Sequence, residues 1–388
     1  MAVIVISFDG VTDTQFEKMA NQPDLYPNIA KFKSEAIYRN GIKSIFVTNT
    51  YPIHTTIATG KLPSEHGVIS NFVETDKGRI WAQLANLIKS ETIWDVARKK
   101  GLTVASILWP VTCGADIKWN MPEVHIYGNE NQVIQNLKYG SKIFQLQAFL
   151  KHGKNLKGIE PISLDDFTTS VACDLLKKKK PDLTLIHLLA FDSFSHMFGG
   201  QSGEIDEAKK SLDASLGRIL EAANQMPEAT IIAFSDHGHF DAFEMVNLCE
   251  IFGENVYEQC GGSAFLNPKQ FSDGESFSLI KSGIEIENLA QFENFPWFER
   301  FLTEQEMIES GYASVATHGI AAKKGYCFSD EKQHKSNHGY PVDYEDYNVF
   351  YAIREGAEYI KTAHEIETKY GDVRDITELI KQILGLKM

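Results

Sequence analysis

The chain has 388 residues, which is enough to bury a large core in one domain or two. Its apolar fraction of 43% is ordinary for a globular protein, and its formal net charge of −14 argues against a nucleic-acid-binding surface. The five cysteines are odd in number and include no Cys-x-x-Cys pair, so a disulfide framework or a thiolate zinc site is not expected.

The first predicted element is a strand over Val3–Phe8, which ends at Asp9. This apolar run is too short to span a membrane, and it lacks the basic start and the small-residue cleavage site of a signal peptide. No longer apolar run follows. We therefore expect a cytoplasmic protein with no membrane partner.

Further short runs rich in Val and Ile predict six more strands. Several are apolar throughout, which is typical of strands buried on both faces of a sheet. The predicted strands are Lys43–Val47, Thr103–Leu108, Leu183–Leu189, Thr230–Phe234, Ala313–Ala316 and Val349–Ile353.

Amphipathic patterns between these runs predict helices. Glu91–Lys100 stops at Gly101, Phe167–Lys180 stops at Pro181, and Glu204–Gln225 stops near Pro227. Capping-box patterns predict two more helices, at Thr303-x-x-Glu306 and Asp375-x-x-Glu378. The basic run Lys177–Lys180 is interpreted as a solvated helix end, where cations suit the helix dipole.

Alternating strands and helices predict an α/β fold, a three-layer αβα sandwich around a mostly parallel central sheet. We expect one domain over residues 1–388. The alternation breaks over 253–296, where Gly, Ser, Glu and Phe are frequent, and we expect a small inserted lid or subdomain within the domain, over 253–330.

Ligands of open α/β sheets bind at the carboxyl ends of the strands. Four predicted strands end at polar side chains there: Asp9, Thr50, Asp192, and the pair Asp236 and His237. A hydroxyl among carboxylates and imidazoles is what a metal-dependent hydrolase with a covalent intermediate needs.

Thr50 also lies at or just before a predicted helix, Ile53–Thr59, which has Pro52 in its first turn and Gly60 at its end. The positive end of the helix dipole favours an alkoxide or a bound phosphate. An ordinary N-cap threonine would give the same pattern.

Asp192 and His196 are four residues apart, so one helical turn places both on one face, where they can share a metal ion. Most other histidines of the chain are expected to be structural. That group contains His54, His66, His125, His152, His187, His318, His334 and His364, and His239 is a candidate supporting group.

The order of several motifs resembles a known family, the type I phosphodiesterase/nucleotide pyrophosphatase family of the alkaline phosphatase superfamily. The motifs are Phe8-Asp9-Gly10, Thr50-Tyr51-Pro52-x-His54, Thr59-Gly60-x-x-Pro63-x-x-His66-Gly67-x-x-x-Asn71, Ile93-Trp94, Trp109-Pro110, Asp192-x-x-x-His196, Asp236-His237-Gly238 and His338-Gly339-Tyr340. The resemblance implies an alkaline phosphatase-like fold.

The resemblance also implies residue roles. Thr50 is the nucleophile, and Asn71 binds a phosphoryl oxygen. Two divalent metal ions are implied, with zinc favoured and manganese or iron as alternatives. One ion is held by Asp9, Asp236, His237 and the Thr50 oxygen. The other is held by Asp192, His196 and His338.

Two positions depart from the family pattern. His187 stands where nucleotide-hydrolysing relatives place a tyrosine, and Ser195 replaces a glycine. Tyr51 keeps an aromatic face beside the nucleophile. Tyr51 and His187 are therefore the expected substrate-binding residues.

The predicted function is hydrolysis of phosphodiester or pyrophosphate bonds through a phosphothreonine, with a small phosphate ester or a nucleotide as substrate. The alternatives are a phosphomonoesterase, a phosphonate hydrolase resembling phosphonoacetate hydrolase, or a metal-binding protein without catalysis. The oligomeric state is left open.

Overall fold

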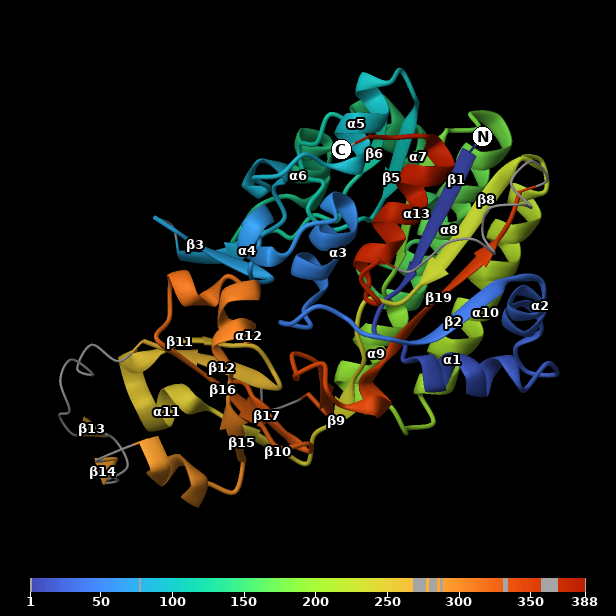
Figure 1. Cartoon of the computed structure of the whole chain (residues 1–388). Helices are drawn as coiled ribbons and strands as arrows, with labels where there is room; N and C mark the ends of the chain where they lie inside the picture. The colour runs from blue at the N-terminus through green and yellow to red at the C-terminus, as the bar shows by residue number, and fades with distance from the viewer. Residues whose placement is uncertain are drawn as a thin grey trace.

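The computed structural model describes residues 2–76, 78–267, 277–278, 285–286, 289–330, 334–356 and 369–387. Its centre is a seven-stranded sheet (Figure 1). The strand order is β2 (Ile37–Ile42), β19 (Val349–Arg354), β8 (Ala229–Phe234), β1 (Ala2–Phe8), β7 (Leu183–Leu188), β5 (Val104–Ile107) and β6 (Trp119–Met121).

Most pairs in this sheet are parallel. β1 pairs in parallel with β7 and β8, and β5 does so with β7 and β6, whereas β19 is antiparallel to both of its neighbours. All seven residues of β1 are buried, as expected of a strand covered on both faces.

Helices cover both faces of the sheet, because alternate side chains of each strand point to opposite sides. Ile4 and Ile6 pack in one apolar cluster with α1 (Asp13–Ala20), α2 (Pro27–Glu35), α8 (Pro161–Lys178), α9 (Ala190–Phe198) and α10 (Ile205–Ala223). Val3 and Val5 pack in another with α3 (Thr50–Thr59), α5 (Ile93–Lys99) and α13 (Arg374–Leu384). The predicted three-layer αβα sandwich is confirmed.

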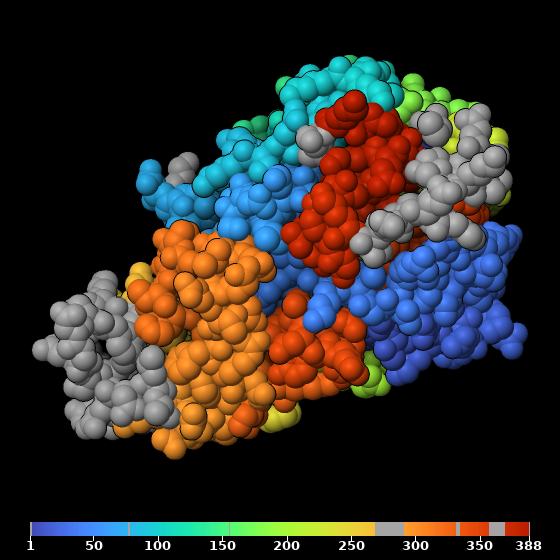
Figure 2. All heavy atoms as spheres, in the orientation of Figure 1, coloured from blue at the N-terminus to red at the C-terminus, as the bar shows by residue number. Residues whose placement is uncertain are grey.

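A second lobe, gold and orange in Figure 1, contains an antiparallel sheet. Its strand order is β11 (Val256–Gln259), β12 (Ser263–Leu266), β16 (His318–Ala322) and β15 (Phe298–Phe301), and it carries α11 (Leu248–Phe252) and α12 (Glu304–Glu309). Figure 2 shows this lobe lying directly against the blue N-terminal segments.

The predicted insert over 253–330 falls in this lobe, although 268–276, 279–284 and 287–288 lie outside the described residues, as does His364. β10 (Glu244–Val246) pairs with β17 (Tyr326–Phe328), so the lobe begins before residue 253. Its action as a lid stays a prediction.

The remaining elements are short strands, 3-10 turns and one short helix, together with two longer helices near the edge strand β6. They are α4 (Pro63–His66), β3 (Phe72–Thr75), β4 (Gly78–Trp81), α6 (Gln132–Tyr139), α7 (Lys142–His152), β9 (Phe240–Asp241), β13 (Phe277–Ser278), β14 (Glu285–Ile286) and β18 (Ser336–Asn337), with 3-10 turns at Ala85–Leu87, Gly153–Asn155, Gly253–Asn255, Leu289–Asn294, Tyr312–Ser314 and Glu345–Tyr347. No helix in the described part of the chain is both long enough and apolar enough to cross a bilayer.

Two strand predictions are wrong. Lys43–Val47 is the connection from β2 to α3, and its apolar Phe46 and Val47 pack against the second lobe instead of entering the sheet. Ala313–Ala316 overlaps the turn at Tyr312–Ser314. There Val315 and Ala316 belong to the same apolar cluster as Tyr312 and Phe265, so the apolar character of this run reflects packing within the second lobe.

Both helices predicted from capping boxes exist, but only one box forms. The Thr303 side chain caps α12, with Glu306 completing the box. α13 instead begins at Arg374, and the Asp375 carboxylate accepts hydrogen bonds from the backbone N–H groups of Lys369, Tyr370 and Gly371. Asp375 therefore closes the preceding loop.

Candidate active site

The polar strand ends meet at one edge of the sheet, as their positions predict. Asp9 follows β1, Asp236 and His237 follow β8, and Asp192 lies in the first turn of α9, just after β7. Asp9 and Asp192 border a cavity of about 560 Å3 beside Thr50, whereas Asp236 and His237 are fully buried and do not line it. The predicted site residues that line it are Asp9, Thr50, Tyr51, Asn71, His187, Asp192, His196 and His338.

Four side-chain atoms converge at the start of α3. His237 Nε2 lies 3.3 Å from Thr50 Oγ1, 3.3 Å from Asp9 Oδ1 and 3.4 Å from Asp236 Oδ2. Ligand atoms bonded at about 2.0 Å to one tetrahedral zinc ion lie about 3.3 Å apart. These spacings therefore match those of ligands around one ion.

The two carboxylates of this cluster also leave buried oxygens without hydrogen-bond partners. Asp9 Oδ1 and Asp236 Oδ2 are both in this state, whereas Asp236 Oδ1 accepts from the backbone N–H groups of Gly10 and His237. A buried charge without a partner is costly, and a cation between these oxygens would remove that cost. The residues present thus fit a divalent ion.

The electrostatics of the cluster agree with this fit. Burial raises the pKa of Asp9 well above its usual range, and the charges of Asp236 and Asp192 raise it further. Burial also lowers the pKa of His237, which keeps its imidazole neutral. A neutral imidazole has the lone pair that a metal ligand needs.

Neighbouring histidines hold this cluster in place. His187 Nε2 lies 2.9 Å from Asp9 Oδ2, and its Nδ1 lies 3.2 Å from the Leu108 carbonyl oxygen. His54 bonds the Thr50 carbonyl oxygen and Ser7 Oγ, and burial lowers its pKa to about 3. Although His187 lines the cavity, its polar contacts are therefore with a candidate metal ligand and the backbone; its role toward substrate stays a prediction.

The second predicted ligand set is arranged differently from the expectation. Its members Asp192, His196 and His338 do not form one compact triad in the described part of the chain. Instead, Asp192 belongs to two groups whose ligand atoms lie within 4.8 Å of one another: one with His196 and His239, the other with His237 and His338. Asp192 is therefore shared by these two groups of candidate ligands.

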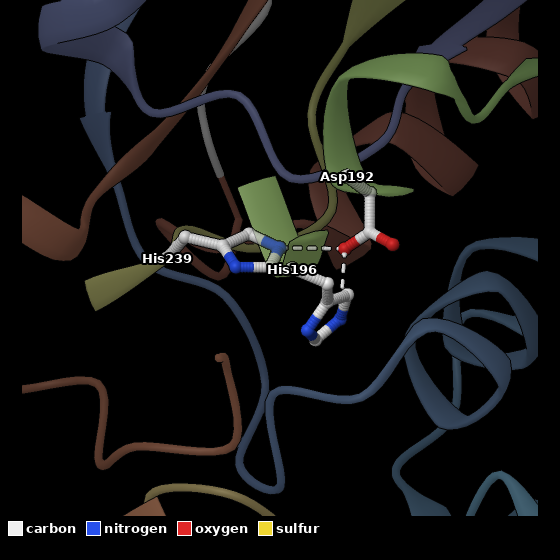
Figure 3. Close-up of side chains that lie close together, drawn as sticks. All are labelled: Asp192, His196 and His239. Atoms are coloured by element: carbon white, nitrogen blue, oxygen red, sulfur yellow. Dashed lines mark hydrogen bonds and ion pairs between the residues drawn. The ribbon is translucent and has the colours of Figure 1, made fainter. Parts of the chain in front are cut away.

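Figure 3 shows His196 and His239 both directed at the same oxygen of the Asp192 carboxylate. His239 Nε2 lies 2.6 Å from Asp192 Oδ1, and His196 Nε2 lies 3.5 Å from it. Burial alone would raise the pKa of Asp192, but the two imidazoles hold it well below its usual range. Burial lowers the pKa of His196 to about 4, and it lowers the pKa of His338 well below its usual value.

Second partners orient these imidazoles. His196 Nδ1 lies 2.9 Å from the Ser336 carbonyl oxygen, His239 Nδ1 lies 3.1 Å from Ser336 Oγ, and His338 Nδ1 lies 3.0 Å from Asn49 Oδ1. Such contacts fix ring orientation in metal sites. Sequence reasoning kept His239 only as a supporting candidate, but its ring lies 5.6 Å from that of His237 and 4.7 Å from that of His196.

The Thr50 hydroxyl lies at a helix N-terminus, as predicted. α3 starts at Thr50 and ends at Gly60, whose φ of 70° favours glycine. Asn71 lines the cavity beside it, and its Oδ1 accepts from the Tyr51 backbone N–H at 2.9 Å. Because Oδ1 is used in this way, the side-chain NH2 group of Asn71 remains to donate a hydrogen bond to a ligand.

One wall of the cavity is aromatic. Trp81 stacks on His125 with centroids 4.1 Å apart, and the Tyr51 ring lies 5.4 Å from Trp81. The Tyr51 hydroxyl donates to Glu123 at 3.1 Å. Sequence reasoning missed Trp81, His125 and Glu123, because they lie in no motif and reach the cavity only through the β3–β4 hairpin and the segment after β6.

Another part of the rim joins the two lobes. Glu258 of β11 accepts from Ser70 Oγ at 2.5 Å and from the Tyr312 hydroxyl at 2.6 Å, and it forms an ion pair with Arg79 of β4. Arg79 and Glu258 both line the cavity. These contacts fix the hairpin of the sandwich to the second lobe.

Comparisons with known proteins agree on the family. The family model described as type I phosphodiesterase / nucleotide pyrophosphatase matches residues 3–340. Venom phosphodiesterase 2 of Crotalus adamanteus is 26% identical over 61% of the chain, and ectonucleotide pyrophosphatase/phosphodiesterase family member 3 of Rattus norvegicus is 28% identical over 61%. The matches cover 26% and 24% of those proteins, so the chain spans about a quarter of their length.

Solved structures share the fold over the whole chain. Inactive murine ectonucleotide pyrophosphatase/phosphodiesterase 5 in complex with AMP has a TM-score of 0.69 and 17% identity, covering 100% of this chain and 96% of its own. Phosphonoacetate hydrolase of Sinorhizobium meliloti in complex with phosphonoformate has a TM-score of 0.69 and 13% identity, covering 99% and 96%. The alkaline phosphatase-like fold expected from the sequence is confirmed.

Proposed function

The chain belongs to the type I phosphodiesterase/nucleotide pyrophosphatase family, and we propose that it hydrolyses phosphodiester or pyrophosphate bonds through a phosphothreonine at Thr50. The observation that carries this proposal is the convergence of Thr50 Oγ1, Asp9 Oδ1 and Asp236 Oδ2 on His237 Nε2. That arrangement places a hydroxyl within a candidate cation site.

Asp9, Asp236, His237 and Thr50 would hold one divalent ion, and Asp192, His196 and His338 would hold the other. Carboxylate and imidazole ligands suit zinc, with manganese or iron as alternatives. When bound, two such ions supply Lewis-acid activation of the attacking hydroxyl and charge neutralisation at the leaving oxygen.

The residues of the chain then perform a displacement at phosphorus. The Thr50 hydroxyl gives its proton to solvent, and its Oγ1 forms the new P–O bond as the bond to the leaving oxygen breaks, so that the leaving group departs as an alcohol or a phosphate. The Asn71 amide donates to a non-bridging oxygen, and the N-terminus of α3 favours the negative charge there. Water then attacks the phosphorus of the Thr50 adduct and the bond to Thr50 Oγ1 breaks, which releases a phosphate monoester and returns a proton to the Thr50 hydroxyl.

Charge around Thr50 favours a diester over a monoester. A phosphodiester carries one negative charge, whereas a monoester carries up to two. Arg79 is the one Lys or Arg side chain among the described residues that line the cavity, and it is already paired with Glu258. The neutral Asn71 amide therefore suits a singly charged phosphodiester better than a doubly charged phosphomonoester.

The aromatic wall of Tyr51 and Trp81 offers a surface for a flat substituent such as a nucleobase. A structural neighbour of this chain was solved in complex with AMP. We infer a small phosphate ester or a nucleotide as the substrate class.

A substrate panel tests this function. We expect bis-nitrophenyl phosphate and a nitrophenyl nucleotide ester to be hydrolysed with at least about tenfold higher kcat/KM than nitrophenyl phosphate or phosphonoacetate, because only the diesters match the single charge that the site accepts. Faster turnover of the monoester, or of phosphonoacetate, would replace this proposal with a phosphomonoesterase or a phosphonate hydrolase. Absence of turnover with bound metal would favour a metal-binding protein.

A second prediction concerns His239. Its contact with Asp192 predicts that His239→Leu weakens zinc binding at the second site by about 10- to 100-fold, the range found when a partner of a metal ligand is removed. His239→Gln keeps a donor and should recover part of the affinity. Titration with a competing zinc chelator measures this effect.

The matched control for that titration is His318→Gln, since His318 lies in the second lobe on β16. It should bind zinc as the unaltered protein does. Equal affinity in His239→Leu and the unaltered protein would show that His239 does not support the site.

A further inference from the structure

Residues 131–159, which contain α6 and α7, have an unusual charge for this protein. The segment carries five lysines and no Asp, Glu or Arg, so its net charge is +5, while the whole chain carries −14. The lysines are Lys138, Lys142, Lys151, Lys154 and Lys157. Figure 1 places α7 next to β6, the edge strand of the central sheet, and α6 packs on α7.

The same segment exposes large apolar side chains. Fourteen such side chains are exposed in the described part of the chain, and seven lie here: Val133, Ile134, Ile143, Leu146, Phe149, Leu150 and Ile159. Ile143 is 75% exposed and Leu150 76%. Clustered exposure of this kind marks an interaction surface, whereas single exposed residues do not.

Helix geometry gathers four of these side chains into one stripe. Ile143, Leu146 and Leu150 follow the spacing i, i+3, i+7, and Phe149 borders them. α7 buries Gln145 and Ala148 on its other side. The helix therefore turns its apolar stripe outward, opposite to the usual arrangement in a globular protein.

A basic groove continues this surface. A cavity of about 890 Å3 runs between α7 and α8, with Trp119, Ile143 and Phe144 as apolar walls. Its lysines are Lys118, Lys142, Lys151, Lys178 and Lys179, and its single acidic side chain, Asp174, pairs with Lys151 and His152. The basic run Lys177–Lys180 at the end of α8 thus borders the same surface.

We propose that the α6–α7 surface, residues 131–159, binds the surface of a bilayer that contains anionic phospholipids. An outward aliphatic stripe flanked by lysines is the pattern of helices that lie in the membrane interface, and it needs no spanning segment. Lysines near such a bilayer are attracted to its negative surface potential. The sequence-based expectation of no membrane partner came from the lack of a spanning run and of a signal peptide, and neither of these concerns a helix that lies in the interface.

Other occupants fit less well. A symmetric dimer through this surface would bring two segments of charge +5 together. A nucleic-acid site would use arginine and stacking aromatic side chains, whereas the segment has no arginine and Phe149 is its one exposed aromatic ring.

Co-sedimentation of the full chain with vesicles tests the proposal. We expect at least about tenfold tighter binding to phosphatidylcholine vesicles that contain about 30% phosphatidylserine than to phosphatidylcholine alone, and weaker binding as salt rises. Ile143→Ser with Leu150→Ser keeps the charge, and Lys142→Gln with Lys154→Gln and Lys157→Gln keeps the apolar stripe. Each variant should lose at least about tenfold in affinity.

The matched control is Ile308→Ser, which removes an exposed apolar side chain of α12 in the second lobe and should bind vesicles normally. Because all these positions are exposed, circular dichroism and phosphodiesterase activity in solution should not change. Failure to bind anionic vesicles would overturn the proposal, as would unchanged binding by the Ile143→Ser, Leu150→Ser variant. A dimer that this variant dissociates, without vesicle binding, would assign the surface to self-association.

Discussion

Thr50→Ala should lower kcat for bis-nitrophenyl phosphate by at least about a thousandfold, because the variant has no hydroxyl to attack phosphorus. Asp9, Asp236 and His237 remain in the variant, so it should still bind zinc, with reduced affinity. Thr50→Ser restores a hydroxyl on the same carbon and should recover most of the lost activity.

Steady-state kinetics measure the rate. Acid quenching during turnover, followed by mass spectrometry, should find a peptide that carries a nitrophenyl phosphoryl group on residue 50 only in the proteins with a hydroxyl at this position. Thr59→Ala is the matched control, since its hydroxyl lies at the other end of α3 and donates to the Thr55 carbonyl oxygen. It should retain activity within about threefold. A Thr50→Ala protein with a tenth or more of normal activity would exclude Thr50 as the nucleophile.

Removal of metal should abolish activity and also destabilise the fold. Since the pKa of Asp9 is raised in the folded protein, ionising it costs stability, and this cost grows as pH rises from the unfolded pKa to the folded one. At higher pH the metal-free protein bears the whole cost, which a bound cation removes. Zinc at a large excess over its Kd should therefore raise Tm by at least about 5 °C.

The Asp9→Asn variant separates the cost of the buried Asp9 charge from the stabilisation by bound zinc. Without metal it should melt at a higher temperature than the unaltered protein, because one of two facing carboxylates has lost its charge. With zinc it should gain much less in Tm, and its activity should fall at least about a thousandfold, since a ligand of the proposed ion is gone.

Calorimetry with and without zinc measures both changes in Tm. Asp213→Asn is the control, because Asp213 is buried away from the cavity and accepts from the Ile29 backbone N–H. Zinc should raise the Tm of this variant by as much as it raises the Tm of the unaltered protein. An equal gain in Asp9→Asn would contradict a cation at this position.

The parts of the site that sequence could predict are those set by local chemistry. Asp9, Asp192 and Asp236 stand at the ends of fully apolar strands, and such strands are both easy to find and fixed in direction by a parallel sheet. Thr50 was found for a similar reason, since Pro52 and Gly60 mark the ends of a short helix. Their roles in catalysis stay proposals until they are tested.

What sequence could not predict depends on contacts between distant segments. The edge strand β2 is mostly half-buried or exposed, so it lacks the apolar run by which strands were predicted. Glu258 meets Arg79 only because the second lobe packs on the β3–β4 hairpin. The sequence also could not predict that the apolar stripe on α7 faces outward. Periodicity shows that a helix is amphipathic, but not which of its faces packs against the rest of the protein.

The central claim is that Thr50 lies within a cation site formed by Asp9, Asp236 and His237. Anomalous diffraction at the zinc absorption edge, from crystals grown with zinc, tests it most directly. We expect one anomalous peak in contact with Thr50 Oγ1 and the three ligand side chains, and a second beside Asp192. Crystals that show no peak there, with the Thr50 side chain turned away from His237, would contradict it.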